Sequence, residues 1–225
     1  MRTYVEVIPA ADGGELARAW SFDLGQWGVS ATADSISAAV DKLQQVTWAS
    51  SLEVDEVIYG DERAFSRDLE PATAGERAST LTILEQSRDR TFDLMLSATE
   101  DDLDRPLDAG DQSHNPWKTA RELAWHFADV ESRVLIPALG LRPRPREEAL
   151  LDELRSSHNA VMEAVAKLPE ALITVTPSGS EWTSVKVLRR LAWHERQHLA
   201  RLEQLLANKV DASTESSNEA SHFFG

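Results

Sequence analysis

Two histidines, His194 and His198, stand four residues apart in a segment whose sequence is otherwise typical of a helix. Positions four apart lie on one helix face about one turn from each other, so both imidazoles can reach the same metal ion. The face continues in steps of three and four residues through Val187, Leu191, His194, His198, Leu202 and Leu205. Both rings are therefore expected to point inward, where a polar ring needs a partner, and a metal ion suits two such rings.

Other inward-facing positions carry polar side chains with the same periodicity. His126 follows Leu123 on an apolar stripe, His158 follows Leu154, and Arg88 follows Leu84. Metal sites in helical bundles are built from the side chains of facing helices. We therefore predict a shared metal site formed by His126, His194 and His198, whose imidazole nitrogens suit zinc, nickel, copper or iron.

Several residues near these histidines are candidates for supporting roles. Glu122, Asp129 and Glu195 lie within about one turn of a histidine and could hold its second ring nitrogen. Asp129 and Glu195 are also candidate proton relays in catalysis, and the alternative for all three is an ordinary solvated face. Three further residues are assigned to substrate binding, with Arg88 suited to an anionic group: Arg88, His158 and Trp125.

The segment His194-Glu195-Arg196-Gln197-His198 also satisfies the H-E-x-x-H signature of zinc proteases, with Glu195 as general base. Such enzymes usually take a third ligand downstream. Only the rest of one helix and a polar tail follow His198, whereas His126 lies upstream on another predicted helix. The arrangement with an upstream third histidine is therefore preferred.

Composition excludes several classes of function. The 225-residue chain has no cysteine, which excludes disulfides, a thiol nucleophile and thiolate metal ligands. Its formal charge of -15 argues against nucleic acid or an anionic membrane as a partner. No apolar run is long enough to span a bilayer, and the first residues lack a signal-peptide core, so the expected location is the cytoplasm.

The periodicity divides the chain into an α+β part and a larger α part. Residues 1–60 predict three strands, a helix from about 35 to 52 and a last strand, and residues 61–71 predict a charged linker. Residues 72–208 predict a four-helix bundle. Its helices are expected at about 73–99, 116–139, 146–168 and 181–208, and residues 209–225 are expected to be a disordered tail.

These features resemble the DinB-like (YfiT-type) superfamily of metal-dependent four-helix bundles over about residues 72–208. The resemblance rests on His126, on the His194/His198 pair, and on Trp117 and Trp182 near the starts of two helices. It implies an up-down-down-up bundle, a homodimer, and zinc or nickel held by the three histidines. Characterised relatives include thiol S-transferases and a thiol-dependent isomerase that use low-molecular-weight thiols such as bacillithiol or mycothiol.

The first 60 residues are similar in outline to a HicB-like module. The segments Asp12-Gly13-Gly14, Trp20 to Gly25, Ser30 and Asp34-Ser35 fall in the expected order, although the family's usual Pro before the Gly and the following Cys are missing. No catalytic set is visible there, which favours a role in interaction or dimerisation.

The preferred functional hypothesis is a metal-dependent transferase that joins a small-molecule thiol to a second small substrate. Three histidines leave an open position on zinc, as catalytic sites require. Three alternatives remain at this point. They are a metal-dependent hydrolase, a non-enzymatic binding or regulatory protein with a structural metal, and a metal-free bundle whose histidines form a hydrogen-bond network.

Overall fold

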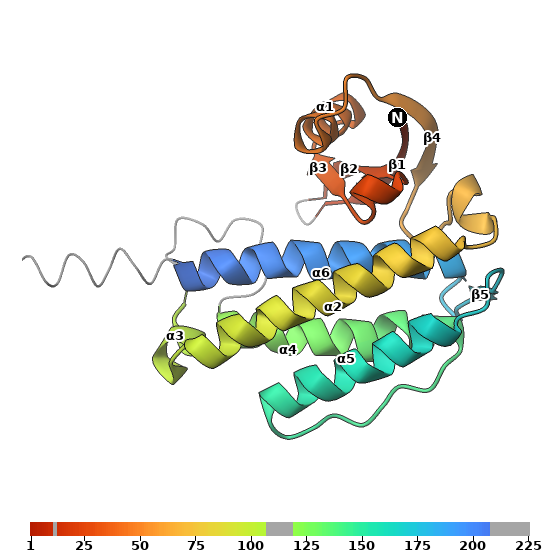
Figure 1. Ribbon diagram of the computed structural model, residues 1–225. Helices are drawn as coiled ribbons and strands as arrows, with labels where there is room; N and C mark the ends of the chain where they lie inside the picture. Colours follow the sequence, from red (N-terminus) through yellow and green to blue (C-terminus); the bar gives the residue numbers. More distant parts are fainter. Residues whose placement is uncertain (11–12, 107–118, 208–225) are drawn as a thin grey trace, which may run out of the picture.

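The computed structural model describes residues 1–10, 13–106 and 119–207. These residues form a small N-terminal sheet domain followed by a mainly helical part, which confirms the predicted fold class at this level (Figure 1). The predicted helix start at 116, Trp117 and the predicted tail after 208 lie outside the described residues. No helix within the described ranges is long and apolar enough to cross a membrane.

The N-terminal domain is a four-stranded sheet with one helix. Its strands are β1 (Arg2–Pro9), β2 (Glu15–Ser21), β3 (Ser30–Ala33) and β4 (Glu53–Tyr59), arranged in the order β3-β2-β1-β4. β1 is antiparallel to β2 and parallel to β4, so α1 (Ile36–Thr47) lies in the crossover between β3 and β4. Leu43 of α1 packs against Val5 and Ala19 in the core of this domain.

The ends of α1 follow from local chemistry. The Ser35 side chain accepts a hydrogen bond from the Ala38 amide and caps the first turn. The helix ends at Thr47 rather than near Leu52 as expected, because Trp48 takes a left-handed conformation with φ of 55°.

The predicted linker is tightly attached to the helical part. The short helix η2 (Ser66–Leu69) lies within it, and the buried Asp68 forms an ion pair of 2.6 Å with Arg189. The buried Lys186 ammonium donates to the carbonyls of Asp61 and Arg63 at 2.8 and 2.6 Å. Segment 61–71 therefore holds the sheet domain in place rather than acting as a flexible tether.

Four long helices form the rest of the described chain: α2 (Ala74–Ser97), α4 (Ala120–Val130), α5 (Leu150–Lys167) and α6 (Ser184–Ala207). They lie side by side beneath the sheet domain, with the short α3 (Glu100–Asp104) following α2 (Figure 1). A reciprocal capping box between Thr73 and Glu76 starts α2. Two apolar clusters fill the bundle, one around Leu188 and Leu191 and the other around Leu123 and Phe127.

The structure corrects three predicted helix boundaries. α5 starts at Leu150 rather than 146, because residues 141–149, here called the strap, form no regular structure around Pro143 and Pro145. α6 starts at Ser184 rather than 181, because β6 (Glu181–Thr183) pairs antiparallel with β5 (Ile173–Val175). α4 ends at Val130 and is continued by the π-helical turn η4 (Glu131–Leu135) and the 3-10 turn η5 (Pro137–Leu139).

The sheet domain packs directly on α6, the helix that carries His194 and His198. Trp27 lies in the bundle core and its indole N–H donates to Thr80 Oγ1 at 2.8 Å. Gly28 has φ of 76°, and a Cβ at this position would lie 2.7 Å from the Ala192 Cβ. The domain and the bundle therefore share α6 in a contact too close for any larger residue at position 28.

Candidate metal centre

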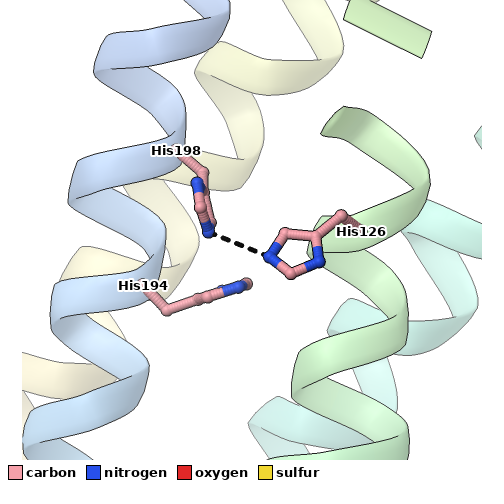
Figure 2. Close-up of side chains that lie close together, drawn as sticks. All are labelled: His126, His194 and His198. Carbon is pink, nitrogen blue, oxygen red and sulfur yellow. Dashed lines mark hydrogen bonds between the residues drawn. The ribbon is translucent and has the colours of Figure 1, made fainter. Parts of the chain in front are cut away.

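Three histidines from two helices meet inside the bundle. His126 comes from α4, and His194 and His198 come from successive turns of α6 (Figure 2). One ring nitrogen of each residue lies within 4.8 Å of the others, and the His126 and His198 Nε2 atoms are 3.2 Å apart. The i, i+4 spacing read from the sequence thus places both α6 rings toward the same point as His126.

The three rings are neutral at pH 7. Burial lowers the pKa of His194 to about 3 and that of His198 to about 2, and it also lowers the pKa of His126. A neutral imidazole is the form that binds a metal ion, since the proton on His⁺ blocks the nitrogen lone pair. The low pKa values therefore keep the cluster ready for a metal across the physiological pH range.

His194 supplies the observation that tests whether the cluster fits a metal. Its side chain is 2% exposed, and its Nε2 atom is buried without a hydrogen-bond partner. A hydrogen-bond network could use the contact between His126 and His198, but it leaves this nitrogen unpaired at an energetic cost. A divalent ion that accepts imidazole nitrogen, such as zinc or nickel, would satisfy it, so the residues present fit such an ion.

A buried charge network lies beneath the histidines. The Glu131 Oε1 atom is 3.3 Å from His194 Nδ1, and Glu131 Oε2 accepts a hydrogen bond of 2.7 Å from Arg88. The Arg88 guanidinium also donates to Glu195 Oε1 at 2.8 Å, and all three charged side chains are completely buried. Burial, together with the nearby Glu131 carboxylate, raises the pKa of Glu195 to about 8. Arg88 is thus the cation that faces both buried acids.

Comparison with known proteins places the chain in a family. A sequence model of the DinB superfamily matches residues 83–202, which is more than half of the chain and includes all three histidines. The chain belongs to the DinB superfamily. This confirms the family expected from the sequence, while the similarity of the first 60 residues to HicB-like modules is not shown.

One solved structure resembles this DinB protein. It is YfiT from Bacillus subtilis, described as a probable metal-dependent hydrolase with an unusual four-helix bundle topology. The two chains are 17% identical, the match covers 67% of this chain and 94% of YfiT, and the TM-score is 0.49. No curated protein sequence matches the chain.

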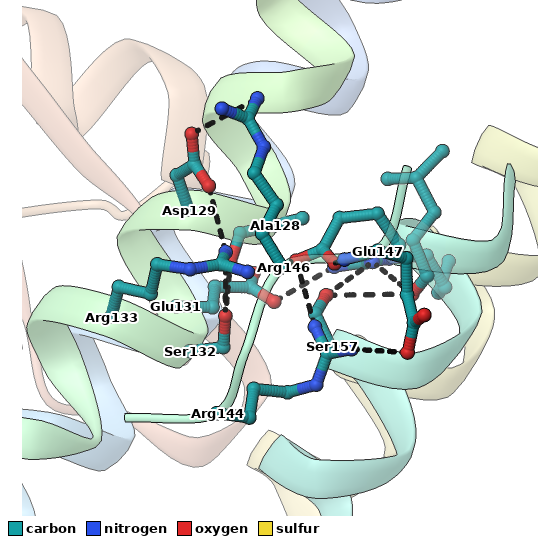
Figure 3. A network of polar contacts seen from close by, with 12 residues as sticks. Ala128, Asp129, Glu131, Ser132, Arg133, Arg144, Arg146, Glu147 and Ser157 are labelled. Atoms are coloured by element: carbon teal, nitrogen blue, oxygen red, sulfur yellow. Dashed lines mark hydrogen bonds and ion pairs between the residues drawn. The ribbon is translucent and has the colours of Figure 1, made fainter. Parts of the chain in front are cut away.

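The other residues predicted for the site of this DinB protein lie outside the triad. Asp129 pairs with Arg133 at 2.7 Å and with Arg146 at 3.5 Å, so it faces the strap (Figure 3). The Arg146 guanidinium also lies 3.9 Å from the Trp125 ring centroid, where it covers this aromatic face. The Glu122 amide is part of the N-terminal cap of α4, where it donates to Thr119.

Arg88 and His158, for which substrate binding was predicted, also lie outside the triad. The Arg88 guanidinium is buried and bonds to Glu131, Glu195 and the Leu154 carbonyl, so its donors are used within the protein. His158 on α5 is not part of the triad; burial lowers its pKa to about 4, with the charge of Arg88 adding to the shift. Arg88 is therefore part of the core, whereas His158 is partly exposed, and the substrate-binding role of both stays a prediction.

Sequence reasoning missed Glu131 as the partner of His194. On a regular helix, a residue five positions beyond His126 points about 140° away from it, so the predicted stripe through Leu123 and His126 leaves Glu131 out. The structure buries a neighbouring face of α4, on which Glu131 lies one turn after the buried Phe127. The structure inserts a π-helical turn here, in which the Ile136 amide donates to the Glu131 carbonyl five residues earlier. Such turns are frequent at functional sites. This one changes the helix face of the residues after Glu131, whereas Glu131 itself keeps the regular α-helical bond to the Phe127 carbonyl.

Phe127 is a second missed residue. Its completely buried ring lies 5.7 Å from the His194 ring and 5.4 Å from the His198 ring, measured between centroids. It limits the rotation of both imidazoles and excludes water from one side of the cluster. Its apolar type at a core position gave the sequence no signal for this role.

We expect Glu131→Ala to lower zinc affinity by about 10–100-fold, because the His194 ring loses the carboxylate that fixes its orientation. Competition against a chromophoric chelator measures this affinity. Glu131→Gln should recover part of it, since the amide oxygen can still accept from Nδ1. Asp129→Ala is the matched control on the preceding turn and should leave affinity within about twofold of the parent. Equal losses in Glu131→Ala and Asp129→Ala would contradict the role of Glu131.

Proposed function

We propose that this DinB protein is a divalent-metal-dependent transferase that uses a low-molecular-weight thiol as cosubstrate. The observation that carries the proposal is the donor set itself: three neutral imidazoles with no fourth ligand among the residues that the structure describes. Within the described ranges, no carboxylate joins the three histidines close enough to share an ion. Structural zinc sites are closed by four protein ligands, whereas catalytic sites have three and keep one position open. The donor set thus favours a catalytic ion over a structural one.

The nucleophile must come from outside the chain. The protein has no cysteine, so any sulfur nucleophile belongs to a cosubstrate. A bound divalent ion would lower the pKa of such a thiol and hold it as the reactive thiolate at neutral pH. His126, His194 and His198 would hold the ion, Glu131 orients the His194 ring, and Phe127 keeps one side dry. We retain Asp129 and Glu195 as candidate carriers of the proton released by the thiol.

The proposal extends to assembly and topology. We infer that the bundle helices run in the up-down-down-up order and that the domain of residues 1–60 is HicB-like and joins two chains in a homodimer. The strand and helix order β1-β2-β3-α1-β4 supports the comparison with HicB-like modules. Segments 61–71 and 72–208 are then the linker and the catalytic bundle, and a cytoplasmic location would supply the reduced thiol.

The test uses full-length protein prepared without an affinity tag. Metal content is measured by mass spectrometry, and the protein loaded with zinc or nickel is then incubated with an electrophile such as monobromobimane. Bacillithiol, mycothiol, glutathione and cysteine are supplied separately. Because this electrophile also reacts with thiols without a catalyst, the rate above a protein-free control is measured. We expect that excess rate, for one of these thiols, to require the metal and to disappear after chelation. Because the chain has no cysteine, every thiol consumed comes from the cosubstrate.

Each other outcome replaces the proposal with a different function. Bound metal with ester or amide hydrolysis and no thiol consumption would make the protein a hydrolase. Bound metal without either activity would favour a binding or regulatory protein. Protein that neither contains nor takes up zinc or nickel would leave the histidines as packing residues.

A further inference from the structure

A second cavity lies in the bundle away from the histidines. Its volume is about 550 Å³, within the range of small-molecule sites, and it is bounded by α5, η5, the strap and the segment before β5. None of His126, His194 and His198 lines it. The cavity is therefore separate from the candidate metal centre, and a ligand there is independent of the proposed transferase activity.

The interior of this cavity is apolar. Ile136 and Leu139 form one wall and Val161 and Leu168 another, and these four side chains are almost completely buried. Ala160 and Ala164 face the same space from α5, and their small side chains leave it open where a larger residue would fill it. An apolar space of this size in a close-packed protein suits an apolar group of a ligand.

The mouth of the cavity is positively charged. Arg142, Arg144 and Lys167 line it together with the single carboxylate Glu163. Arg144 is held by Glu153 at 2.8 Å, as part of the network that fixes the strap (Figure 3), and Lys167 is held by Glu163 at 2.5 Å. Arg142, in contrast, forms no hydrogen bond or ion pair with any residue that the structure describes.

The unpaired guanidinium of Arg142 indicates that the ligand carries a negative charge. The chain carries a formal charge of -15, so carboxylates are abundant, yet none of the described ones neutralises Arg142. A guanidinium binds a carboxylate through two parallel hydrogen bonds. Leu141, 46% exposed, lies next to it and extends the apolar surface to the mouth.

We propose that this cavity binds a single-chain amphiphile with a carboxylate head, such as a fatty carboxylate. The hydrocarbon chain occupies the space between α5 and η5, and the head pairs with Arg142 at the mouth. The apolar walls and the small side chains of Ala160 and Ala164 make room for the hydrocarbon chain of the ligand, and the unpaired Arg142 binds its carboxylate head.

The test is isothermal titration calorimetry of the full-length protein with decanoate and, separately, with 1-decanol. We expect saturable 1:1 binding of decanoate, about tenfold tighter than that of decanol, because only decanoate offers a charge to Arg142. Arg142→Gln should weaken decanoate binding about tenfold and leave decanol unchanged. Ala164→Phe should weaken both about tenfold or more, because the larger side chain fills the cavity.

The controls separate this site from charge effects and from the metal. Arg155→Gln removes one positive charge from α5, where Arg155 is exposed and paired with Asp152, and it should leave decanoate affinity within about twofold. Binding should be the same with and without metal, so failure of the transferase proposal would not affect it. Absence of saturable decanoate binding, equal binding of decanol, or equal losses in Arg142→Gln and Arg155→Gln would overturn the proposal. If Ala164→Phe fails to fold, Arg142→Gln still tests the proposal, because Arg142 is exposed and its replacement should not disturb folding.

Discussion

Replacing either His194 or His198 by alanine is expected to reduce the bound metal from about one equivalent per chain to below about 0.1. Each variant leaves only two of the three imidazoles that converge within 4.8 Å, and two nitrogen ligands hold zinc or nickel much more weakly than three. Metal content by mass spectrometry after dialysis measures the effect. Added zinc should raise the thermal midpoint of the parent and leave that of both variants unchanged, because a ligand stabilises only the folded state that binds it.

His158→Ala is the control for this experiment. His158 is a partly buried histidine of the same bundle that is not part of the triad, so the variant should retain its metal. Metal retained by both His194→Ala and His198→Ala would contradict the assignment of the centre. Loss of metal from His158→Ala as well would indicate that general damage to the bundle, rather than loss of a ligand, releases the ion.

Replacing Arg88 by methionine, which keeps an unbranched apolar stem but no charge, is expected to lower the free energy of unfolding by about 3–5 kcal/mol. Arg88 is the cation between Glu131 and Glu195 in a fully buried network, so its loss leaves an uncompensated buried carboxylate. Burial raises the pKa of both acids, so they take up protons as the pH falls. The destabilisation should therefore be smaller at pH 5 than at pH 7, as measured by urea unfolding of the metal-free protein.

Arg90→Met provides the comparison on the same helix. Arg90 is 52% exposed and pairs with Glu203 at 2.9 Å, so its loss should cost no more than about 1 kcal/mol and change little with pH. A similar cost for both variants, or a cost for Arg88→Met that does not depend on pH, would contradict the role of Arg88 as the counter-ion of the buried acids.

The sequence alone predicted the parts of this protein that depend on local periodicity. Steps of three and four residues placed His126, His194 and His198 on inward faces, and the structure brings their rings together. Alternation in the first 60 residues predicted four strands and a helix, all of which are present. The resemblance carried by the same histidines predicted the DinB superfamily, which the sequence comparison confirms. Helix and strand geometry fix which side chains share a face, so such features can be derived from spacing.

Other features depend on elements that are distant in the sequence. The contact between Glu131 and His194 joins η4 to α6, and the apolar repeat of a single helix does not reveal such a partner. The sequence predicted a charged linker, but it gave no sign that Asp68 is buried against Arg189, which lies more than a hundred residues later. For Arg88 the sequence predicted only an inward position. It could not predict the two acidic partners, because these come from α6 and η4.

Whether a feature could be predicted from the sequence depends on how far apart in the chain its interacting residues lie. Hydrophobic periodicity records whether a position faces the core, and this is decided within a few turns of one helix. The partner of a buried polar group is decided by how helices pack and by which irregular turns they contain, because the group must be satisfied by whatever atom lies opposite. The sequence therefore determined the three metal-binding candidates. Only the tertiary structure decided which carboxylate orients His194, how the sheet domain attaches to α6, and where a cavity away from the histidines remains open.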